Sequence, residues 1–248
     1  MSLFCFASAK GAPGVTTTAL GVAAALPTGD SRCKVLVEAD PSGGSLAIVH
    51  RVSRQPGLIS LTASARHGLS RDDLWSHAQE LGGGLPVVVA PERGDRASAV
   101  LSDGAAALGP WLAQRHDVTA IADCGRINSE QVSSGLISHA NHVFFVVRPT
   151  AEQLQPALAL VDQLQEAGKT VEWVVIGSKP YTPEDIARTT WSELAAVLPD
   201  DHRTARAIAQ GQVGSRERRS PLARSIGALA IRIDDIAAQL SHPVEVPV

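Results

Sequence analysis

The chain has 248 residues, 44% of them hydrophobic, so it can bury a sizeable core and fits one α/β domain. Its formal net charge of −3 gives no global attraction to nucleic acid or to an acidic membrane. No apolar run approaches about 18 residues, and the N-terminal apolar run is short and lacks a basic flank. We therefore expect no transmembrane helix and no signal peptide. The three cysteines have no paired spacing and are expected to be reduced, mostly buried thiols of a cytoplasmic protein.

Apolar runs of strand length alternate with helical patterns along the chain. The predicted strands are 3–7, 35–37, 87–90, 118–122, 143–147 and 171–176. The predicted helices are 16–26, 70–81, 96–114, 129–138, 151–167 and 184–196. The strand runs are continuously apolar, which is typical of strands buried on both faces. This pattern predicts an α/β fold with a mostly parallel central sheet and helices on both faces. We expect residues 1–240 to form one domain and residues 241–248 a flexible tail.

The first apolar run leads into the segment SAKGAPGVTTTAL, residues 8–20. A P-loop has the pattern G-x-x-x-x-G-K-[ST], in which backbone N–H groups cradle phosphates, the lysine reaches the outer phosphates and the hydroxyl binds Mg²⁺. The chain keeps Gly14 and Thr16 of this pattern but has Val15 in place of the lysine. Helix N-terminal amides from Gly14 to Thr17 would still form an anion site. Without further support, an ordinary turn between a strand and a helix is an equal interpretation.

Lys10 favours the nucleotide-binding interpretation, because the chain has only four lysines. The segment resembles the deviant Walker A loop, K-G-G-x-G-K-T, of the ParA/MinD ATPases, in which a signature lysine opens the loop. The resemblance implies that Lys10 is this signature lysine, that Gly11 and Gly14 are loop glycines, and that Thr16 carries the Mg²⁺-binding hydroxyl. Val15 replaces the family's second lysine.

Two further segments resemble the same family at the ends of predicted strands. In VLVEADPSGG, which resembles V-D-x-D-P-x-G-G, Asp40 matches the carboxylate that positions the attacking water and the metal. Glu38 replaces an aspartate and is expected on the same strand face. In DVTAIADCG, Asp123 matches the Walker B aspartate, which orients Mg²⁺ through water. Gly125 falls where the family offers a backbone N–H near the terminal phosphate. The alternatives are a solvated turn for Asp40 and a helix cap for Asp123.

The resemblance covers roughly residues 3–205 and implies a three-layer P-loop NTPase fold with ATP and Mg²⁺ as cofactors. It implies slow ATP hydrolysis with Lys10 and Asp40 as catalytic residues, and metal binding by Thr16, Asp40 and Asp123. The asparagine that the family commonly offers to adenine at the end of the last predicted strand is absent, and Gly177 or Ser178 takes its place. The segments KGAPGVTTTAL and KPYTPEDIA look closest to actinobacterial TadZ/CpaE-like proteins, which position pilus machinery at a cell pole.

The leading prediction is a cytoplasmic positioning switch: a homodimer bridged by nucleotide that a protein partner, such as pilus or secretion machinery, recruits to the membrane or a cell pole. The missing loop lysine favours an alternative, a pseudo-ATPase scaffold without turnover. A metal-dependent or nucleophilic enzyme is a distant third interpretation. The arginine-rich segment 214–224 lacks interleaved aromatic residues, so a solvated helix start is favoured over a DNA or lipid contact. The amphipathic pattern over 226–240 is interpreted as core packing, because its polar face carries little basic charge.

Overall fold

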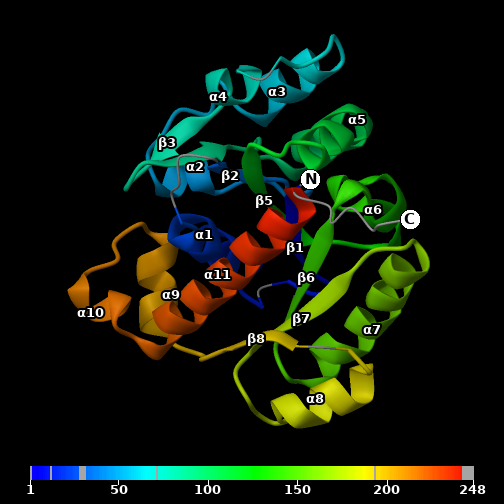
Figure 1. Cartoon of the computed structure of the whole chain (residues 1–248), viewed down its shortest axis with the longest axis vertical. Helices are drawn as coiled ribbons and strands as arrows, with labels where there is room; N and C mark the ends of the chain where they lie inside the picture. Colours follow the sequence, from blue (N-terminus) through cyan, green and yellow to red (C-terminus); the bar gives the residue numbers. More distant parts are fainter. Residues whose placement is uncertain (1, 12, 28–31, 71, 193, 242–248) are drawn as a thin grey trace, which may run out of the picture.

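The computed structural model describes residues 2–11, 13–27, 32–70, 72–192 and 194–241. Within them an eight-stranded sheet runs through the molecule in the order β3-β4-β2-β5-β1-β6-β7-β8 (Figure 1). Its strands are β1 (Leu3–Ser8), β2 (Cys33–Glu38), β3 (Gln79–Leu81), β4 (Leu85–Val88), β5 (Val118–Arg126), β6 (His142–Val147), β7 (Val171–Ile176) and β8 (Leu194–Leu198). Every neighbouring pair is parallel except β3 and β4. The predicted mostly parallel sheet is therefore confirmed.

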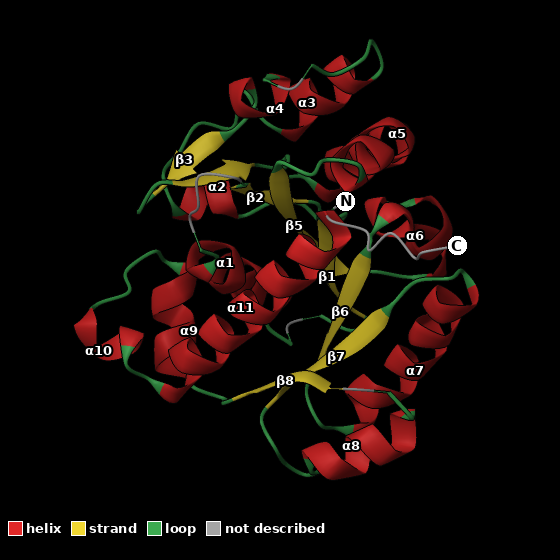
Figure 2. Cartoon of the chain, viewed as in Figure 1, coloured by secondary structure: helices red, strands yellow, loops and turns green. Residues whose placement is uncertain are grey.

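Helices cover both faces of this sheet (Figure 2). They are α1 (Val15–Ala25), α2 (Leu46–Val49), α3 (Leu58–Ala65), α4 (Asp73–Ser76), α5 (Gly94–Ala113), α6 (Ser129–Ser134), the 3₁₀ helix η1 (Leu136–His139), α7 (Ala151–Glu166), α8 (Pro183–Thr190), α9 (His202–Ala209), α10 (Ser215–Arg218) and α11 (Pro221–Ser241). Side chains alternate along β1: Phe4 and Phe6 join the apolar cluster under α1, α9 and α11, whereas Cys5 joins the cluster under α3, α5 and α7. The three-layer α/β architecture is thus built around a sheet whose central strands β1, β5, β6 and β7 are buried, while the edge strands β3 and β8 are partly exposed.

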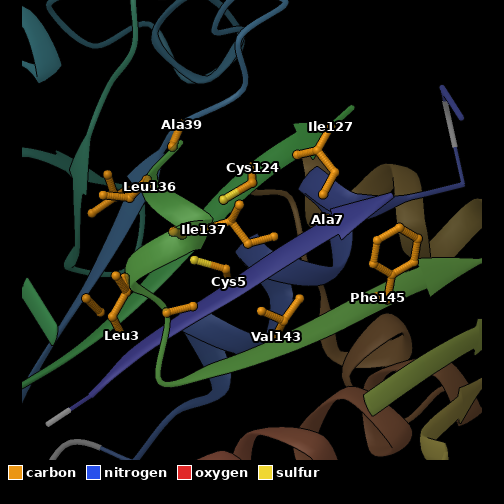
Figure 3. Close-up of a cluster of buried hydrophobic side chains, with 14 of the residues drawn as sticks. Leu3, Cys5, Ala7, Ala39, Cys124, Ile127, Leu136, Ile137, Val143 and Phe145 are labelled. Carbon is orange, nitrogen blue, oxygen red and sulfur yellow. The ribbon is translucent and has the colours of Figure 1, made fainter. Parts of the chain in front are cut away.

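Figure 3 shows the second of these clusters, in which Cys5 and Cys124 of the central strands lie beside Ile137 of η1, and Phe145 of β6 lies on the other side of β1 in this view. Both of these cysteines are buried and free, while Cys33 is exposed. Because β1, β5 and β6 carry apolar side chains on both faces, the central strands are rigidly held. The loops that follow them therefore start from fixed positions.

Two of the predicted helices are wrong in part. Residues 70–81 were expected to be helical, but only α4 is helical there and 79–81 form β3, which pairs with β4 across a glycine turn. Gly83 and Gly84 in that turn have φ of 87° and 78°, a conformation that favours a tight hairpin. The helix predicted over 184–196 ends at Thr190 as α8, and the edge strand β8 follows it.

Shorter elements also differ from the predictions. Helices α2 and α3 were not predicted, and the helix expected over 129–138 divides at Gly135, whose extended backbone separates α6 from η1. The core-packing interpretation of the C-terminal pattern is confirmed, because Ile226, Leu229 and Ile233 of α11 are buried against the sheet. Helix α11 extends through Ser241, and the rest of the expected tail lies outside the described residues. None of the described helices has the length and apolarity to span a membrane.

Candidate functional site

The predicted site residues meet above three neighbouring central strands. Strands β2, β5 and β1 are adjacent and parallel, so their carboxyl ends lie at one edge of the sheet, where ligands bind in folds of this class. A cleft of about 630 Å³ opens there. It is lined by Ser8, Gly11, Pro13, Gly14, Val15, Thr16, Thr17, Asp40, Ser42, Gly125 and Arg126. Of the predicted residues, only Lys10 and Asp123 are outside this lining.

The loop after β1 turns into α1 at Gly14. Gly14 has φ of 114° and occupies the N-cap position, and no side chain of a described residue caps the helix there. A residue with a Cβ adopts this backbone conformation only with strain. The N–H groups of the first turn of α1 therefore remain available at the floor of the cleft, where they form an anion-binding geometry supported by the helix dipole.

A ParA/MinD loop has two lysines, at the positions that Lys10 and Val15 occupy here. Neither residue places a positive charge in the cleft of its own chain. The Val15 side chain is 5% exposed and packs in the apolar cluster under α1. Lys10 is exposed and lies outside the cleft lining. Its carbonyl oxygen accepts a 2.8 Å hydrogen bond from the Ser8 hydroxyl, which fixes the backbone at the start of the loop.

Asp123 lies beneath the cleft, at the end of the apolar part of β5. It is 1% exposed, its Oδ1 accepts a 3.1 Å hydrogen bond from Gly125 N–H, and the Thr16 side chain lies close enough to lower its pKa. Burial raises the pKa of Asp123 to about 7, and the nearby Asp40 and Glu38 carboxylates act in the same direction. The alternative role as a helix cap is wrong, because α6 is capped by Asn128. The Thr16–Asp123 pair is therefore the link between the loop and β5.

Asp40 reaches the cleft from the loop that follows β2. Its Oδ1 accepts a 2.7 Å hydrogen bond from Ser42 N–H, which forms a local turn, and its carboxylate lies against Gly125. Burial raises the pKa of Asp40, whereas the hydrogen bonds from Ser42 and the positive charge of Arg126 lower it. A half-buried carboxylate beside a second buried one makes this part of the cleft attractive to a cation.

Glu38 has a structural role that its sequence position did not reveal. It is 2% exposed, and its carboxylate accepts hydrogen bonds from three backbone N–H groups: Ser45 at 2.6 Å, Leu46 at 2.9 Å and Ala90 at 2.9 Å. Burial raises the pKa of Glu38, and these hydrogen bonds counteract that effect. Glu38 does not line the cleft; it ties the loop carrying Asp40 to the end of β4. A glutamate can reach these amides because its side chain is one methylene longer than that of aspartate.

The expected role of the Gly125 amide is not available in this geometry, since Gly125 N–H already donates to Asp123. Gly125 instead has φ of 57° and lacks the Cβ that would collide with Asp40. Arg126, which follows it, lines the cleft and was missed in the sequence. Arg126 directly follows the Asp-Cys-Gly segment at the end of a predicted strand, and this position in the sequence could have indicated that it lies at the site.

A smaller cavity of about 60 Å³ adjoins the cleft on the side of β7 and β8 and shares Pro13, Gly14 and Thr17 with it. Its apolar walls come from β7, β8, α9 and α11, and the charged or polar residues Arg148, Asp200, Asp201 and His202 line it as well, with the Arg148–Asp200 ion pair at 2.7 Å. This cavity, called the apolar cavity below, thus offers apolar surface beside the polar cleft. This arrangement suits a ligand with a phosphate chain and a flat apolar ring.

The donor set also fits a hydrated Mg²⁺ ion. Within the described residues, no three His, Cys, Asp or Glu side chains gather into a metal-holding group. Mg²⁺ nevertheless keeps several waters and is usually held by one or two protein oxygens together with substrate phosphates. The Thr16 hydroxyl and the Asp123 and Asp40 carboxylates provide oxygens of this kind in the cleft and directly beneath it.

Comparisons with known proteins agree with this fold. No family model and no curated protein matches the chain. Solved structures do match: the septum site-determining protein MinD with Mg-ADP from Pyrococcus horikoshii has 17% identity and a TM-score of 0.71, covering 98% of this chain and 99% of that chain. A ParA family ATPase from Chlorobium tepidum has 18% identity and a TM-score of 0.73, covering 93% and 98%. The MinC:MinD cell division protein complex of Aquifex aeolicus has 15% identity and a TM-score of 0.71, covering 95% and 96%. The chain therefore has the three-layer P-loop NTPase fold of these proteins.

Proposed function

We propose that this chain is a nucleotide-binding switch protein of the ParA/MinD type, folded as a single domain, which binds ATP with Mg²⁺ in the cleft above β1, β5 and β2. One observation carries the proposal: the first turn of α1, the neighbouring Thr16 and Asp123 side chains and the Asp40 carboxylate converge on one cleft. The fold shared with MinD and ParA structures supports it.

The proposed roles follow from the positions of the side chains. The amides of α1 hold the phosphates, and Gly11, Gly14 and Thr17 line their path. Thr16 and Asp123 hold Mg²⁺, which neutralises phosphate charge when it is bound. Asp40 accepts a hydrogen bond from the attacking water and orients it. The adjoining apolar cavity takes the base, with Gly177 rather than an asparagine at the end of β7.

Isothermal titration calorimetry with Mg·ATP tests the binding. We expect an affinity roughly tenfold to a hundredfold weaker than that of a standard P-loop, because one charge-assisted hydrogen bond from the loop lysine is missing. Thr16→Ala should weaken the affinity further, and chiefly when Mg²⁺ is present. Nanomolar binding by the wild type, or no binding at millimolar ATP, would contradict the proposal.

Phosphate release distinguishes the switch from a scaffold. We expect slow turnover by the wild type, because the P-loop lysine that stabilises the charge developing during phosphoryl transfer is absent here. Asp40→Ala should reduce this turnover to background. If the chain is a scaffold, the wild type binds ATP, and the wild type and Asp40→Ala both release phosphate only at the background rate. The scaffold is the second candidate function, and the burial of Val15 is the observation that favours it.

The proposed switch acts as a nucleotide-bridged homodimer that binds a protein partner. The exposure of Lys10, outside the cleft of its own chain, supports a position from which it reaches the nucleotide of the partner subunit. One similar solved structure is a complex of MinD with MinC. For this chain we propose a partner from pilus or secretion machinery, as in TadZ/CpaE-like proteins, with recruitment from the cytoplasm to the membrane or a cell pole.

A further inference from the structure

The charges that face the cleft are unbalanced for a phosphate ligand. Among the described lining residues, Arg126 is the one cationic side chain, and it shares the cleft with the Asp40 carboxylate. The buried Asp123 carboxylate lies directly below. A nucleoside triphosphate adds several negative charges. If Mg²⁺ were the one positive charge near these carboxylates, the cleft would repel the outermost phosphate, so a cationic side chain is needed as well.

Arg126 occupies a fixed position at the rim of this cleft. It is the last residue of β5 and lies in register with Ser8, the last residue of β1, so it faces the point where the phosphate loop begins. The side chain is exposed, and the structure gives it no hydrogen bond or ion pair with any described residue. Its charge is nevertheless close enough to influence Asp40. The N–H donors of the guanidinium group are therefore free for a ligand.

The two compartments of the site determine which phosphate Arg126 would meet. The apolar cavity lies towards β7 and β8, whereas Arg126 and Asp40 lie on the β5 and β2 side of the cleft. Gly14 and Thr17 belong to both compartments and stand between them. A nucleotide with its base in the apolar cavity consequently extends its phosphate chain past α1 towards Arg126.

We propose that Arg126 compensates in part for the missing loop lysine by donating hydrogen bonds to the terminal phosphate of a bound nucleoside triphosphate. This inference rests on the nucleotide-binding function proposed above. Arginine suits the role because its planar guanidinium group forms paired hydrogen bonds with phosphate oxygens. It also explains how a loop that has Val15 packed into the core could still distinguish a triphosphate from a diphosphate.

Calorimetric titration of the full chain with Mg·ATP and with Mg·ADP tests the inference through binding rather than turnover. Arg126→Gln should weaken ATP binding about tenfold to a hundredfold and change ADP binding less than about threefold. Arg126→Lys keeps the charge and should recover part of the loss. Arg188→Gln is the matched control, because the Arg188 side chain is 77% exposed on α8, far along the sheet from the cleft. Thermal unfolding of each variant confirms that the fold is retained.

The outcomes separate this inference from the function on which it rests. If the wild type binds ATP and Arg126→Gln binds it equally well, the role of Arg126 is wrong while nucleotide binding stands. Equal losses for ATP and ADP would also overturn the assignment to the terminal phosphate. If the wild type binds neither nucleotide, both the inference and the proposed function fail.

Discussion

The carboxylate of Asp40 lies directly against the α-carbon of Gly125, so that a Cβ on residue 125 would overlap it. This contact joins the loop after β2 to the end of β5. It leaves no room for any other residue at position 125 unless Asp40 moves. The position of the proposed water-orienting carboxylate therefore depends on a glycine in a neighbouring strand.

Gly125→Ala should displace Asp40 and reduce phosphate release to background, while ATP affinity changes by no more than a few-fold. Gly168→Ala is a matched control, because Gly168 also has positive φ, 75° against 57°, but has open space around its Cβ position. Both variants carry a backbone strain of about 1 kcal/mol, and only the first has the steric collision. Equal activity of the two variants would show that the contact with Asp40 does not matter.

Val15→Lys should destabilise the protein instead of restoring a standard loop. Val15 is 5% exposed and packs in an apolar cluster, so a lysine there loses these apolar contacts whether it buries its charge or turns its side chain into the cleft, which Val15 also lines. We expect the free energy of unfolding to fall by about 1–3 kcal/mol, measured by urea denaturation. Val15→Ile, which keeps the site apolar, is the control. A Val15→Lys protein as stable as the wild type and with tighter ATP binding would mean that the longer side chain fits the cleft.

The contribution of Asp123 to the stability of the nucleotide-free protein should decrease as the pH rises from about 4 to 7. The pKa of Asp123 is about 7 in the folded chain, against an ordinary value of 3.8, because the carboxyl group is buried. Between these values the folded state binds more protons than the unfolded state, so its advantage is lost as the pH rises. Asp123 alone accounts for a change of up to about 4 kcal/mol.

Urea denaturation at several pH values measures this slope. Asp123→Asn should flatten it, because the amide keeps the size of the side chain and has no proton to lose. Asp40 and Glu38, whose pKa values are also raised by burial, contribute a slope of the same sign, whereas His50 and His139, whose pKa values are lowered by burial, contribute one of the opposite sign. The comparison of Asp123→Asn with the wild type isolates the part that Asp123 contributes. An unchanged slope in Asp123→Asn would show that Asp123 is ionised throughout this range.

ATP, or a non-hydrolysable analogue, should increase the dimer fraction of the wild type, and Lys10→Ala should abolish that increase. The reason is that Lys10 is exposed and outside the cleft of its own chain, so its charge can serve a nucleotide in the partner subunit. Size-exclusion chromatography with light scattering measures the dimer fraction with and without nucleotide.

Lys179→Ala is the control variant, because Lys179 is also exposed and its loss removes one positive charge elsewhere on the surface. It should leave the ATP-dependent increase of the dimer fraction unchanged. Because Lys10 contributes nothing to the core, Lys10→Ala should unfold at the wild-type temperature. A wild type that stays monomeric at saturating ATP would refute the role across the dimer, and so would a Lys10→Ala protein that dimerises fully.

The central strands and the order of the site motifs could be predicted from the sequence. Short continuous apolar runs such as 143–147 are typical of strands in a sheet that is covered on both faces. Parallel connection then requires the residues after β1, β2 and β5 to share one edge, so the convergence of Thr16, Asp40 and Asp123 was predictable. Short or edge elements were not, because the few residues of β3 and β8 fit a helical pattern as well as a strand.

The directions of the side chains in the site follow from the folded chain and not from the sequence pattern. The sequence could not show that Val15 is buried under α1, that Glu38 binds three backbone amides, or that Gly125 makes room for Asp40. Each of these facts depends on contacts between segments that are distant in the chain, and residue spacing carries no information about such contacts. The same is true of Arg126, which becomes a candidate phosphate ligand only because β5 lies next to β1 and ends beside the phosphate loop.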